Sequence, residues 1–176
     1  TERMRYEAQL EQHANYDTLS GLPNRNLFGD RLEQAVTRAR RNARLAAVLY
    51  MDLDHFKRIN DSLGHAVGDE VIAAVGARLA GALRSGDTVG RVGGDEFVIL
   101  LHEIRREDDA VRVAEKAREV VAAPLKIERN EFVLSASVGI ALFPRDGGDA
   151  ATLLRNADTA LYRAKSEGRD GWRFFT

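Results

Sequence analysis

The most informative stretch of this sequence is Arg91-Val92-Gly93-Gly94-Asp95-Glu96-Phe97-Val98-Ile99-Leu100-Leu101. Its two ends have the composition of β-strands, and the apolar run after Glu96 is typical of a buried strand. Gly93 and Gly94 tolerate positive φ angles, which predicts a tight hairpin turn between the strands. Such a turn would hold the carboxylates of Asp95 and Glu96 at its tip, a suitable place for a metal ion and a polyphosphate. For the turn on its own, a plain hairpin with two solvated acids is the alternative interpretation.

The composition is that of one balanced domain. The 176 residues carry 26 Lys and Arg against 27 Asp and Glu, and a net charge of −1 argues against a general nucleic-acid binder. The absence of cysteine excludes disulfides and thiolate chemistry, and the 4 histidines lack the spacing of a zinc site. No apolar run approaches the roughly 20 residues of a membrane span, so we expect no membrane contact. Because the chain starts at Thr1 without a signal peptide, we expect a cytoplasmic piece of a longer protein, whose full-length form can be membrane-tethered.

The hydrophobic pattern mixes helices, strands and hairpins. Helical periodicity predicts helices at about 1–16, 25–42, 69–83, 107–122 and 149–166, the first being a linker helix ahead of a domain at 17–176. Apolar runs predict further strands at 45–53, in two parts of 131–143 and at 172–175. The segment 45–53 is apolar almost throughout, as expected of a central strand covered on both faces. We therefore expect an α/β domain of the α+β type, with one mixed sheet covered by helices.

Acidic residues mark the ends of two predicted strands. Asp52 closes the central strand, so the carboxylates of Asp52, Asp95 and Glu96 converge if the hairpin pairs beside that strand. Strand periodicity puts Asp52 and Asp54 on one face and does not choose between them. Hard oxygen ligands of this kind favour Mg²⁺ or Mn²⁺ over zinc. Carboxylates buried this close together need a cation, because without one they lose stability or take up protons.

Basic and amide side chains elsewhere suit a nucleoside triphosphate. Lys57 follows the central strand, and Lys165 and Arg169 lie four apart at the end of the last helix. Each alone is usually a surface charge, but beside a magnesium site they are suited to hold a triphosphate. Asn60 and Asp69 flank a glycine-containing loop and can read the Watson–Crick edge of guanine. Asp69 is equally well placed as a helix N-cap.

Taken together, these segments resemble the GGDEF domain, the catalytic module of bacterial diguanylate cyclases, over about residues 17–175. The matching segments, in the family's order and spacing, are Asp17-Thr18-Leu19-Ser20-Gly21-Leu22-Pro23-Asn24-Arg25, Asp52-Leu53-Asp54-His55-Phe56-Lys57-Arg58-Ile59-Asn60-Asp61, Gly64-His65, Gly68-Asp69, Gly93-Gly94-Asp95-Glu96-Phe97, Ala160-Leu161-Tyr162-Arg163-Ala164-Lys165 and Gly168-Arg169. The departures are mild: Ser20 stands where the family often has Thr, and Asp170 where Asn is common.

The resemblance implies a palm-like fold with a central mixed five-stranded sheet, related to nucleotide cyclases and polymerases. It also implies a nucleotidyltransferase that joins two GTP molecules into cyclic di-GMP and releases two pyrophosphates. One GTP would be held by each domain of a homodimer. By motif position, two magnesium (or manganese) ions per active site would be held by Asp52, the backbone carbonyl of Leu53, Asp95 and Glu96.

The resemblance also assigns roles to the remaining motif residues. The implied substrate-binding residues are Phe56, Lys57, Asn60, His65, Asp69, Gly93, Gly94, Lys165 and Arg169. The guanosine end would be held by Asn60, His65 and Asp69, and the phosphates by Lys57, Lys165 and Arg169. Catalysis would depend on Asp95, Glu96 and Lys57, with Asp95 as the candidate base for the attacking 3′-hydroxyl group.

Two features bear on regulation. Arg84-Ser85-Gly86-Asp87 begins nine residues before Gly93 and has the Arg-x-x-Asp pattern of the family's product-inhibition site, where cyclic di-GMP binds. A helix-terminal arginine with a local ion pair is the simpler interpretation of Arg84 and Asp87. The segments 22–25 and 87–89 are also similar to GGDEF domains that precede an EAL phosphodiesterase domain. The alternative to a cyclase is therefore a non-catalytic module that senses GTP or cyclic di-GMP inside a larger protein, and a helix-dimerisation segment at 1–16 is a weaker third hypothesis.

Overall fold

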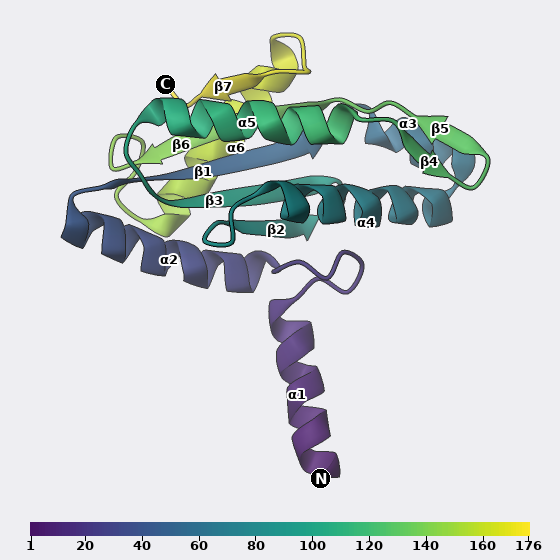
Figure 1. Ribbon diagram of the computed structural model, residues 1–176, viewed down its shortest axis with the longest axis horizontal. Coiled ribbons are helices and arrows are strands. Elements are labelled where there is room, and N and C mark those ends of the chain that lie inside the picture. Colours follow the sequence, from purple (N-terminus) through teal and green to yellow (C-terminus); the bar gives the residue numbers. More distant parts are fainter.

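The computed structural model describes residues 1–176 and contains a five-stranded sheet in the order β2-β3-β1-β6-β7 (Figure 1). Its strands are β1 (Leu45–Leu53), β2 (Thr88–Gly93), β3 (Glu96–Ile104), β6 (Ala136–Phe143) and β7 (Trp172–Phe174). The central strand β1 pairs antiparallel with β3 and β6, whereas β7 pairs parallel with β6. The predicted mixed five-stranded sheet with a central 45–53 strand is confirmed.

Helices cover both faces of this sheet. They are α1 (Glu2–Asn15), α2 (Arg25–Asn42), α3 (Phe56–Leu63), α4 (His65–Ala82), α5 (Glu107–Ala122) and α6 (Ala150–Ser166). One face packs against α4 and α5 around a core of 27 buried residues, and the other packs against α2 and α6 around a core of 16. Along β1, Leu49 and Met51 belong to the first core, and Val48 and Tyr50 to the second. This double burial explains why the β1 sequence is apolar almost throughout.

The first helix, α1, projects away from the body of the domain (Figure 1). None of its residues is buried, and Met4, Tyr6 and Leu10 are exposed. Its last turn is tied to the start of α2, because Asn24 Nδ2 donates to the Ala14 carbonyl at 2.9 Å. None of the helices combines the length and the hydropathy that a bilayer crossing requires.

The predicted start of the helix at 69–83 is wrong. α4 begins at His65, because Gly64, with a φ of 90°, ends α3 and starts α4 directly. Asp69 therefore lies inside α4 and does not cap its N-terminus. The alternative that treated Asp69 as an N-cap is excluded.

The region 125–134 forms a small hairpin of its own. β4 (Leu125–Ile127) pairs antiparallel with β5 (Asn130–Phe132) in a separate two-stranded sheet. The prediction placed the first part of the 131–143 strand region in the main sheet and missed β4. The hairpin folds back at Glu128, whose φ is 57°, and it buries Leu125, Ile127 and the following Leu134 against the α4/α5 core.

Candidate active site

The turn between β2 and β3 is held by an arginine from β2. Gly93 and Gly94 have φ angles of 147° and 48°, which favour glycine. Arg91 Nε donates to the Gly94 carbonyl at 2.9 Å, and Arg91 NH1 donates to Asp17 Oδ1 at 2.7 Å. Asp17 Oδ2 in turn accepts from the backbone amide and the hydroxyl group of Ser20. The roles of Asp17 and Arg91 were not predicted, because spacing alone does not reveal that two segments 74 residues apart meet.

The turn places Asp95 beside Asp52. In the β1–β3 register Asp52 lies opposite Glu96, and the Leu53 amide donates to the Asp95 carbonyl at 3.3 Å. Burial of Asp95 raises its pKa to about 7 together with the nearby Asp52 carboxylate, which carries a like charge and accepts a hydrogen bond from Asp95 only when Asp95 is protonated. Two of the predicted metal ligands are therefore in one place.

Lys165, near the end of α6, is the counter-ion of Asp52. Its ammonium group donates to Asp52 Oδ2. Burial disfavours the charged form of Lys165, but the hydrogen bond and the charge of Asp52 more than offset this, so the pKa of Lys165 lies above its ordinary value. The other oxygen, Asp52 Oδ1, is buried without a hydrogen-bond partner. Such an atom is unfavourable unless a donor or a cation reaches it.

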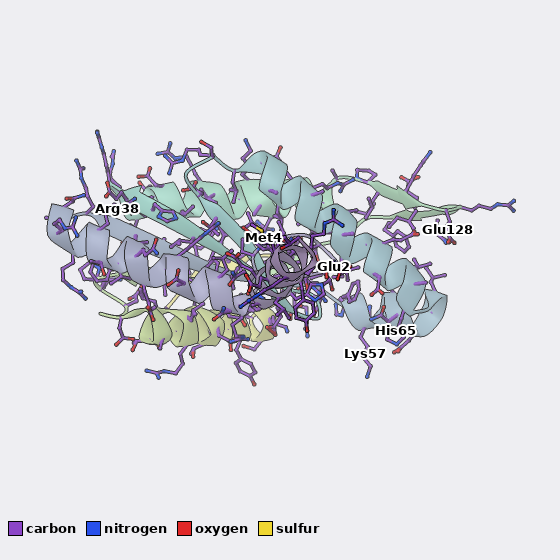
Figure 2. All side chains as sticks on the ribbon, turned by 90° about the horizontal axis from the view of Figure 1, so that it is seen from below. Glu2, Met4, Arg38, Lys57, His65 and Glu128 are labelled. Atoms are coloured by element: carbon purple, nitrogen blue, oxygen red, sulfur yellow. The ribbon has the colours of Figure 1, made fainter.

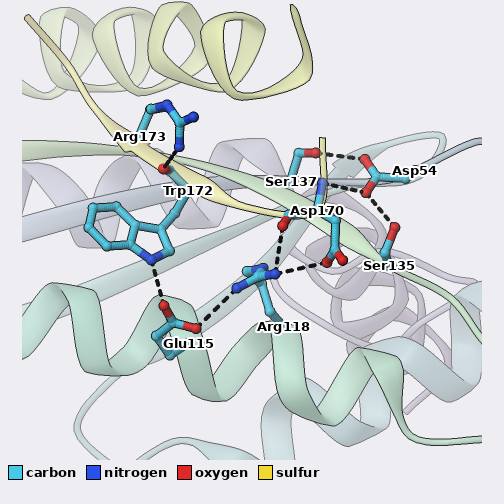
Figure 3. A network of polar contacts seen from close by, with 8 residues as sticks. All are labelled: Asp54, Glu115, Arg118, Ser135, Ser137, Asp170, Trp172 and Arg173. Atoms are coloured by element: carbon cyan, nitrogen blue, oxygen red, sulfur yellow. Dashed lines mark hydrogen bonds and ion pairs between the residues drawn. The ribbon is translucent and has the colours of Figure 1, made fainter. Parts of the chain in front are cut away.

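Asp54 is fully engaged in local structure. Its carboxylate accepts from the hydroxyl groups of Ser135 and Ser137, both at 2.6 Å, and from the Asp170 amide at 3.0 Å (Figure 3). Of the two aspartates that strand periodicity left open, only Asp52 has a buried oxygen without a partner. This difference supports Asp52 as the metal ligand.

Glu96 turns toward β1. The Tyr50 hydroxyl donates to Glu96 Oε2 at 2.9 Å, and burial together with this carboxylate raises the pKa of Tyr50. In the structure no three His, Cys, Asp or Glu side chains lie close enough together to hold one metal ion, and the Glu96 carboxylate faces Tyr50. The role of Glu96 in support of the metal site stays a prediction. Tyr50 was not predicted, because an apolar run gives no sign that one phenol group faces an acid.

The residues at the end of β1 fit a hard divalent cation. Asp52 Oδ1 has no partner, and the pKa of Asp95 is raised. Both observations indicate that the positive charge of Lys165 does not fully compensate the two neighbouring carboxylates. Carboxylate and carbonyl oxygens, without a thiolate, are the ligands that Mg²⁺ and Mn²⁺ prefer.

The predicted guanosine-binding residues lie on α3 and α4. Figure 2 shows Lys57 and His65 projecting from this end of the domain, and both are exposed. Asp69 is also exposed, whereas Asn60 is half-buried. Phe56 is only 7% exposed and packs in the α4/α5 core, so it offers almost no side-chain surface to a ligand.

The second basic residue of the predicted phosphate site is Arg169. It lies in the loop after α6, is exposed and makes no ion pair with the rest of the chain. The Arg169 amide donates to the Ala164 carbonyl at 2.9 Å, which places Arg169 against the end of α6 that carries Lys165. The positive charge of Arg169 acts to lower the pKa of Lys165. The predicted pairing of Lys165 and Arg169 is compatible with this arrangement, although Lys165 is engaged with Asp52.

A cavity of 1070 Å³ lies on the other side of the hairpin, between α2 and α6. It is lined by Tyr50, Arg91, Gly93 and charged residues of both helices. None of the predicted guanosine- or phosphate-binding side chains lines it. The proposed nucleotide site is therefore an open surface at the strand ends rather than this cavity.

Arg84 and Asp87 face each other in the loop between α4 and β2. Arg84 Nε and NH2 donate to the two carboxylate oxygens of Asp87 at 3.2 and 3.3 Å. The side chain of Arg84 is 71% exposed, whereas that of Asp87 is 2% exposed. The local ion pair of the simpler interpretation is present, and the guanidinium group is still accessible from solvent.

Known proteins share the sequence and the fold of this chain. The family model described as "Diguanylate cyclase, GGDEF domain" matches residues 14–171. In Pseudomonas aeruginosa, the bifunctional diguanylate cyclase/cyclic di-GMP phosphodiesterase MucR is 47% identical over 99% of this chain, and the cyclic di-GMP phosphodiesterase NbdA is 39% identical over 96%. This chain spans 25% and 22% of those two proteins. A solved structure comprising only the GGDEF domain of TpbB from Pseudomonas aeruginosa has a TM-score of 0.89 at 40% identity, and covers 92% of this chain and 94% of that one.

Proposed function

Because this chain belongs to the GGDEF domain family, we propose that it is a diguanylate cyclase domain that joins two GTP molecules into cyclic di-GMP and releases two pyrophosphates. The observation that supports this most directly is the pair of Asp52 and Asp95 where β1 meets the hairpin turn. One buried carboxylate oxygen of this pair has no partner, and the second acid has a pKa of about 7.

Asp52, the carbonyl of Leu53 and Asp95 would hold two Mg²⁺ or Mn²⁺ ions, with Glu96 in support. When bound, such ions stabilise the negative charge that develops on the transferring phosphoryl group. The chain supplies a candidate proton acceptor, because the Asp95 carboxylate lies in the site and can take the proton of the attacking 3′-hydroxyl. A cation held beside Asp95 would lower the pKa of about 7 that this acid has in the metal-free chain.

The basic side chains bind the triphosphate. Lys165 neutralises Asp52 in the free chain, and we expect its ammonium group to exchange Asp52 for phosphate oxygens when nucleotide and cation bind together. Arg169 and Lys57 add charge-assisted hydrogen bonds from the end of α6 and from α3. In the free chain the positive charge of Lys165 compensates Asp52, and in the loaded chain the cation would compensate Asp52 while Lys165 compensates phosphate.

The guanine base is read by α3 and α4. Asn60 and Asp69 supply an amide and a carboxylate for its Watson–Crick edge, and His65 contacts the same end of the nucleotide. A site built for hydrogen bonds rejects the wrong base, because its polar groups are then left unpaired. We therefore expect GTP to bind and ATP not to bind.

Two domains are needed for one turnover, because each site holds one GTP. We propose that they act as a homodimer, with α1 free to extend from the body as a linker helix. The initial rate should then rise faster than linearly with protein concentration in dilute solution. A strictly linear dependence down to nanomolar protein would contradict the dimer.

Arg84 and Asp87 are proposed as a product-inhibition site for cyclic di-GMP. A guanidinium group can bridge a phosphate and the N7/O6 edge of guanine, and the exposure of Arg84 leaves it accessible. Cyclic di-GMP bound at Arg84 and Asp87 would lower the activity of the separate active site, which is an allosteric coupling between two sites.

The second candidate is a regulatory module that binds GTP or cyclic di-GMP without turnover. It is favoured by NbdA, which is named as a phosphodiesterase alone, whereas the name of MucR includes a cyclase activity. In a protein of that kind, a GGDEF domain can act on its neighbour instead of producing the messenger.

One assay separates the two candidates. The 176-residue chain is incubated with GTP and Mg²⁺, and cyclic di-GMP is quantified by chromatography beside an Asp52→Asn control. A cyclase gives product that the Asp52→Asn chain does not give. Binding of GTP or cyclic di-GMP without any product supports the regulatory module, and failure to bind either nucleotide contradicts both candidates.

A further inference from the structure

The loop 167–171 follows α6 and carries Arg169. Two consecutive residues in it have left-handed backbones, with a φ of 61° at Arg169 and 43° at Asp170. This conformation is unfavourable for residues that carry a side chain, so it persists only where surrounding contacts hold it. Two other elements supply those contacts.

Asp170 is held from two sides (Figure 3). Its amide donates to Asp54 Oδ2 at 3.0 Å, while its carbonyl and its Oδ1 accept from Arg118 NH2 at 2.6 and 2.8 Å. Asp54 directly follows β1 and is itself fixed by the hydroxyl groups of Ser135 and Ser137. The loop is therefore fastened to the proposed metal-binding end of β1 on one side and to α5 on the other.

The side chain of Arg118 is also held by residues outside the loop. Its side chain is 21% exposed, and its NH1 donates to Glu115 Oε2 at 3.0 Å. The other oxygen of Glu115 accepts from Trp172 Nε1 at 2.7 Å, which ties this pair to β7. Both terminal nitrogens of Arg118 are engaged with protein atoms, and its Nε is buried without a hydrogen-bond partner. The terminal nitrogens therefore contact Glu115 and the loop.

We propose that Arg118 is a positioning residue for the triphosphate site. Through its hydrogen bonds to Asp170, Arg118 holds Arg169 beside Lys165. The inference rests on the proposed function, since it concerns the phosphates of the same site. Two like charges repel each other, so Arg169 would swing away into solvent if the loop were free. A loop fixed at Asp170 removes that freedom and lowers the entropy cost of gripping the phosphates.

A double-mutant cycle tests this mechanism. GTP affinity is measured for the native chain, Arg118→Ala, Arg169→Ala and the double variant. We expect Arg118→Ala to weaken GTP binding about tenfold, the scale of one charge-assisted hydrogen bond, and to cost nothing further in the Arg169→Ala background. Equal losses in both backgrounds would overturn the proposal, because Arg118 would then act independently of Arg169.

Matched variants separate positioning from general damage. Asp170→Asn keeps an acceptor oxygen for Arg118 and should bind GTP as the native chain does. Asp170→Ala removes the Oδ1 contact but keeps the carbonyl contact, so it should weaken GTP binding by less than Arg118→Ala does. Arg78→Ala is the control for loss of an arginine, because Arg78 donates to the carbonyls of Val120, Ala123 and Pro124 and not to the loop. If Arg118→Ala does not fold, the same double-mutant cycle is measured with Arg118→Lys or Asp170→Ala in place of Arg118→Ala.

Hydrogen exchange in the nucleotide-free chain gives a readout that does not depend on the proposed function. Arg118→Ala should speed exchange at the Arg169 and Asp170 amides, which donate to the Ala164 carbonyl and to Asp54. Unchanged exchange at both amides would overturn the proposal even if the chain is a cyclase. A native chain that binds no GTP would overturn the proposed function, while the exchange data still decide whether Arg118 holds the loop.

Discussion

At the scale of single residues, Asp95 combines a position beside Asp52 with a pKa raised to about 7. Asp95→Asn keeps the shape of the side chain but removes its charge from the proposed metal site and its ability to accept a proton. We expect turnover to cyclic di-GMP to fall by at least about a hundredfold, the scale for removing one such electrostatic group. Product formation is measured by chromatography at saturating GTP, and near-native turnover of a folded Asp95→Asn chain would exclude this role.

The same carboxylate predicts a pH dependence of stability. The pKa of Asp95 rises from an ordinary 3.8 to about 7 on folding, so folding disfavours its charged form. The resulting destabilisation is absent below about pH 4, grows as the pH rises to about 7 and is constant above that. Without added metal, Asp95→Asn should therefore unfold at a higher temperature than the native chain at about pH 8, with no difference at about pH 4. Thermal unfolding across this range is the measurement, and a constant difference would show that Asp95 is not responsible.

Substitution of Asp69 tests guanine binding without loss of a helix cap, because α4 begins four residues before Asp69. Without a capping role, Asp69→Ala should change the free energy of unfolding by less than about 0.5 kcal/mol, as for an ordinary surface site. It should weaken GTP binding at least about tenfold, because a charge-assisted bond to guanine is lost. The neighbouring exposed acid provides the control: Glu70→Ala should leave both quantities unchanged. Equal GTP affinities for the two variants would remove Asp69 from the guanine site.

The residues of the candidate site could be predicted from the sequence, but most of the contacts that those residues make could not. Period-two alternation placed Asp52 and Asp54 on one face, and the choice between them depends on serines 81 and 83 residues away from Asp54. The partner of Glu96 was equally hidden, because Tyr50 is one member of an apolar run. Contacts between distant segments follow from the register of the sheet, which the local pattern does not specify.

At the scale of elements, α3 and α4 approach each other closely at Gly68. A Cβ atom there would overlap with Asn60 Oδ1 and lie 3.2 Å from the Phe56 ring. Gly68→Ala should therefore displace Asn60, lower the free energy of unfolding by about 1–3 kcal/mol as an overpacked site and weaken GTP binding without touching the nucleotide. The measurements are chemical denaturation and GTP titration.

The same helix offers the control for Gly68→Ala. A Cβ atom at Gly81 would have no heavy atom within 4 Å outside its own helix turn, so Gly81→Ala should stabilise the chain by up to about 1 kcal/mol and leave GTP affinity unchanged. If both alanine variants bind GTP as the native chain does, the close approach at Gly68 does not position Asn60.

Elements with a strong periodic pattern could be predicted, and those fixed by a turn could not. The helix at 25–42 and the central strand were found at their observed bounds, since caps and apolar runs mark both. The start of α4 was missed because Gly64 joins two helices with no intervening loop. The β4–β5 hairpin was missed because each strand has 3 residues, too short for a period to show.

At the scale of the whole molecule, the loop of Arg84 and Asp87 and the Gly93–Gly94 turn lie at opposite ends of β2. β2 is 6 residues long, which corresponds to on the order of 20 Å. We expect accumulating cyclic di-GMP to slow the native chain, and Arg84→Ala to remove that slowing while its initial rate stays close to native. The measurement is the full progress curve with GTP held constant by regeneration.

The matched control for Arg84→Ala is Ser85→Ala, an exposed substitution in the same turn. It should retain the slowing. If the native curve slows only when GTP is depleted, or if Arg84→Ala slows like the native chain, the ion pair is purely structural and contributes at most about 1 kcal/mol to stability.

Trp172 is the only tryptophan of the chain, and it lies at the end of the hydrogen-bonded series that runs through Glu115 and Arg118 to the Arg169 loop. Its indole ring is half-buried and packs edge-on against Phe174, with the ring centroids 5.6 Å apart. The intrinsic fluorescence of the chain therefore comes mainly from one indole, whose emission depends on the hydrogen bond at Nε1 and on solvent access. This single fluorophore makes the phosphate end of the site observable in real time without a label, in stopped-flow as well as at equilibrium.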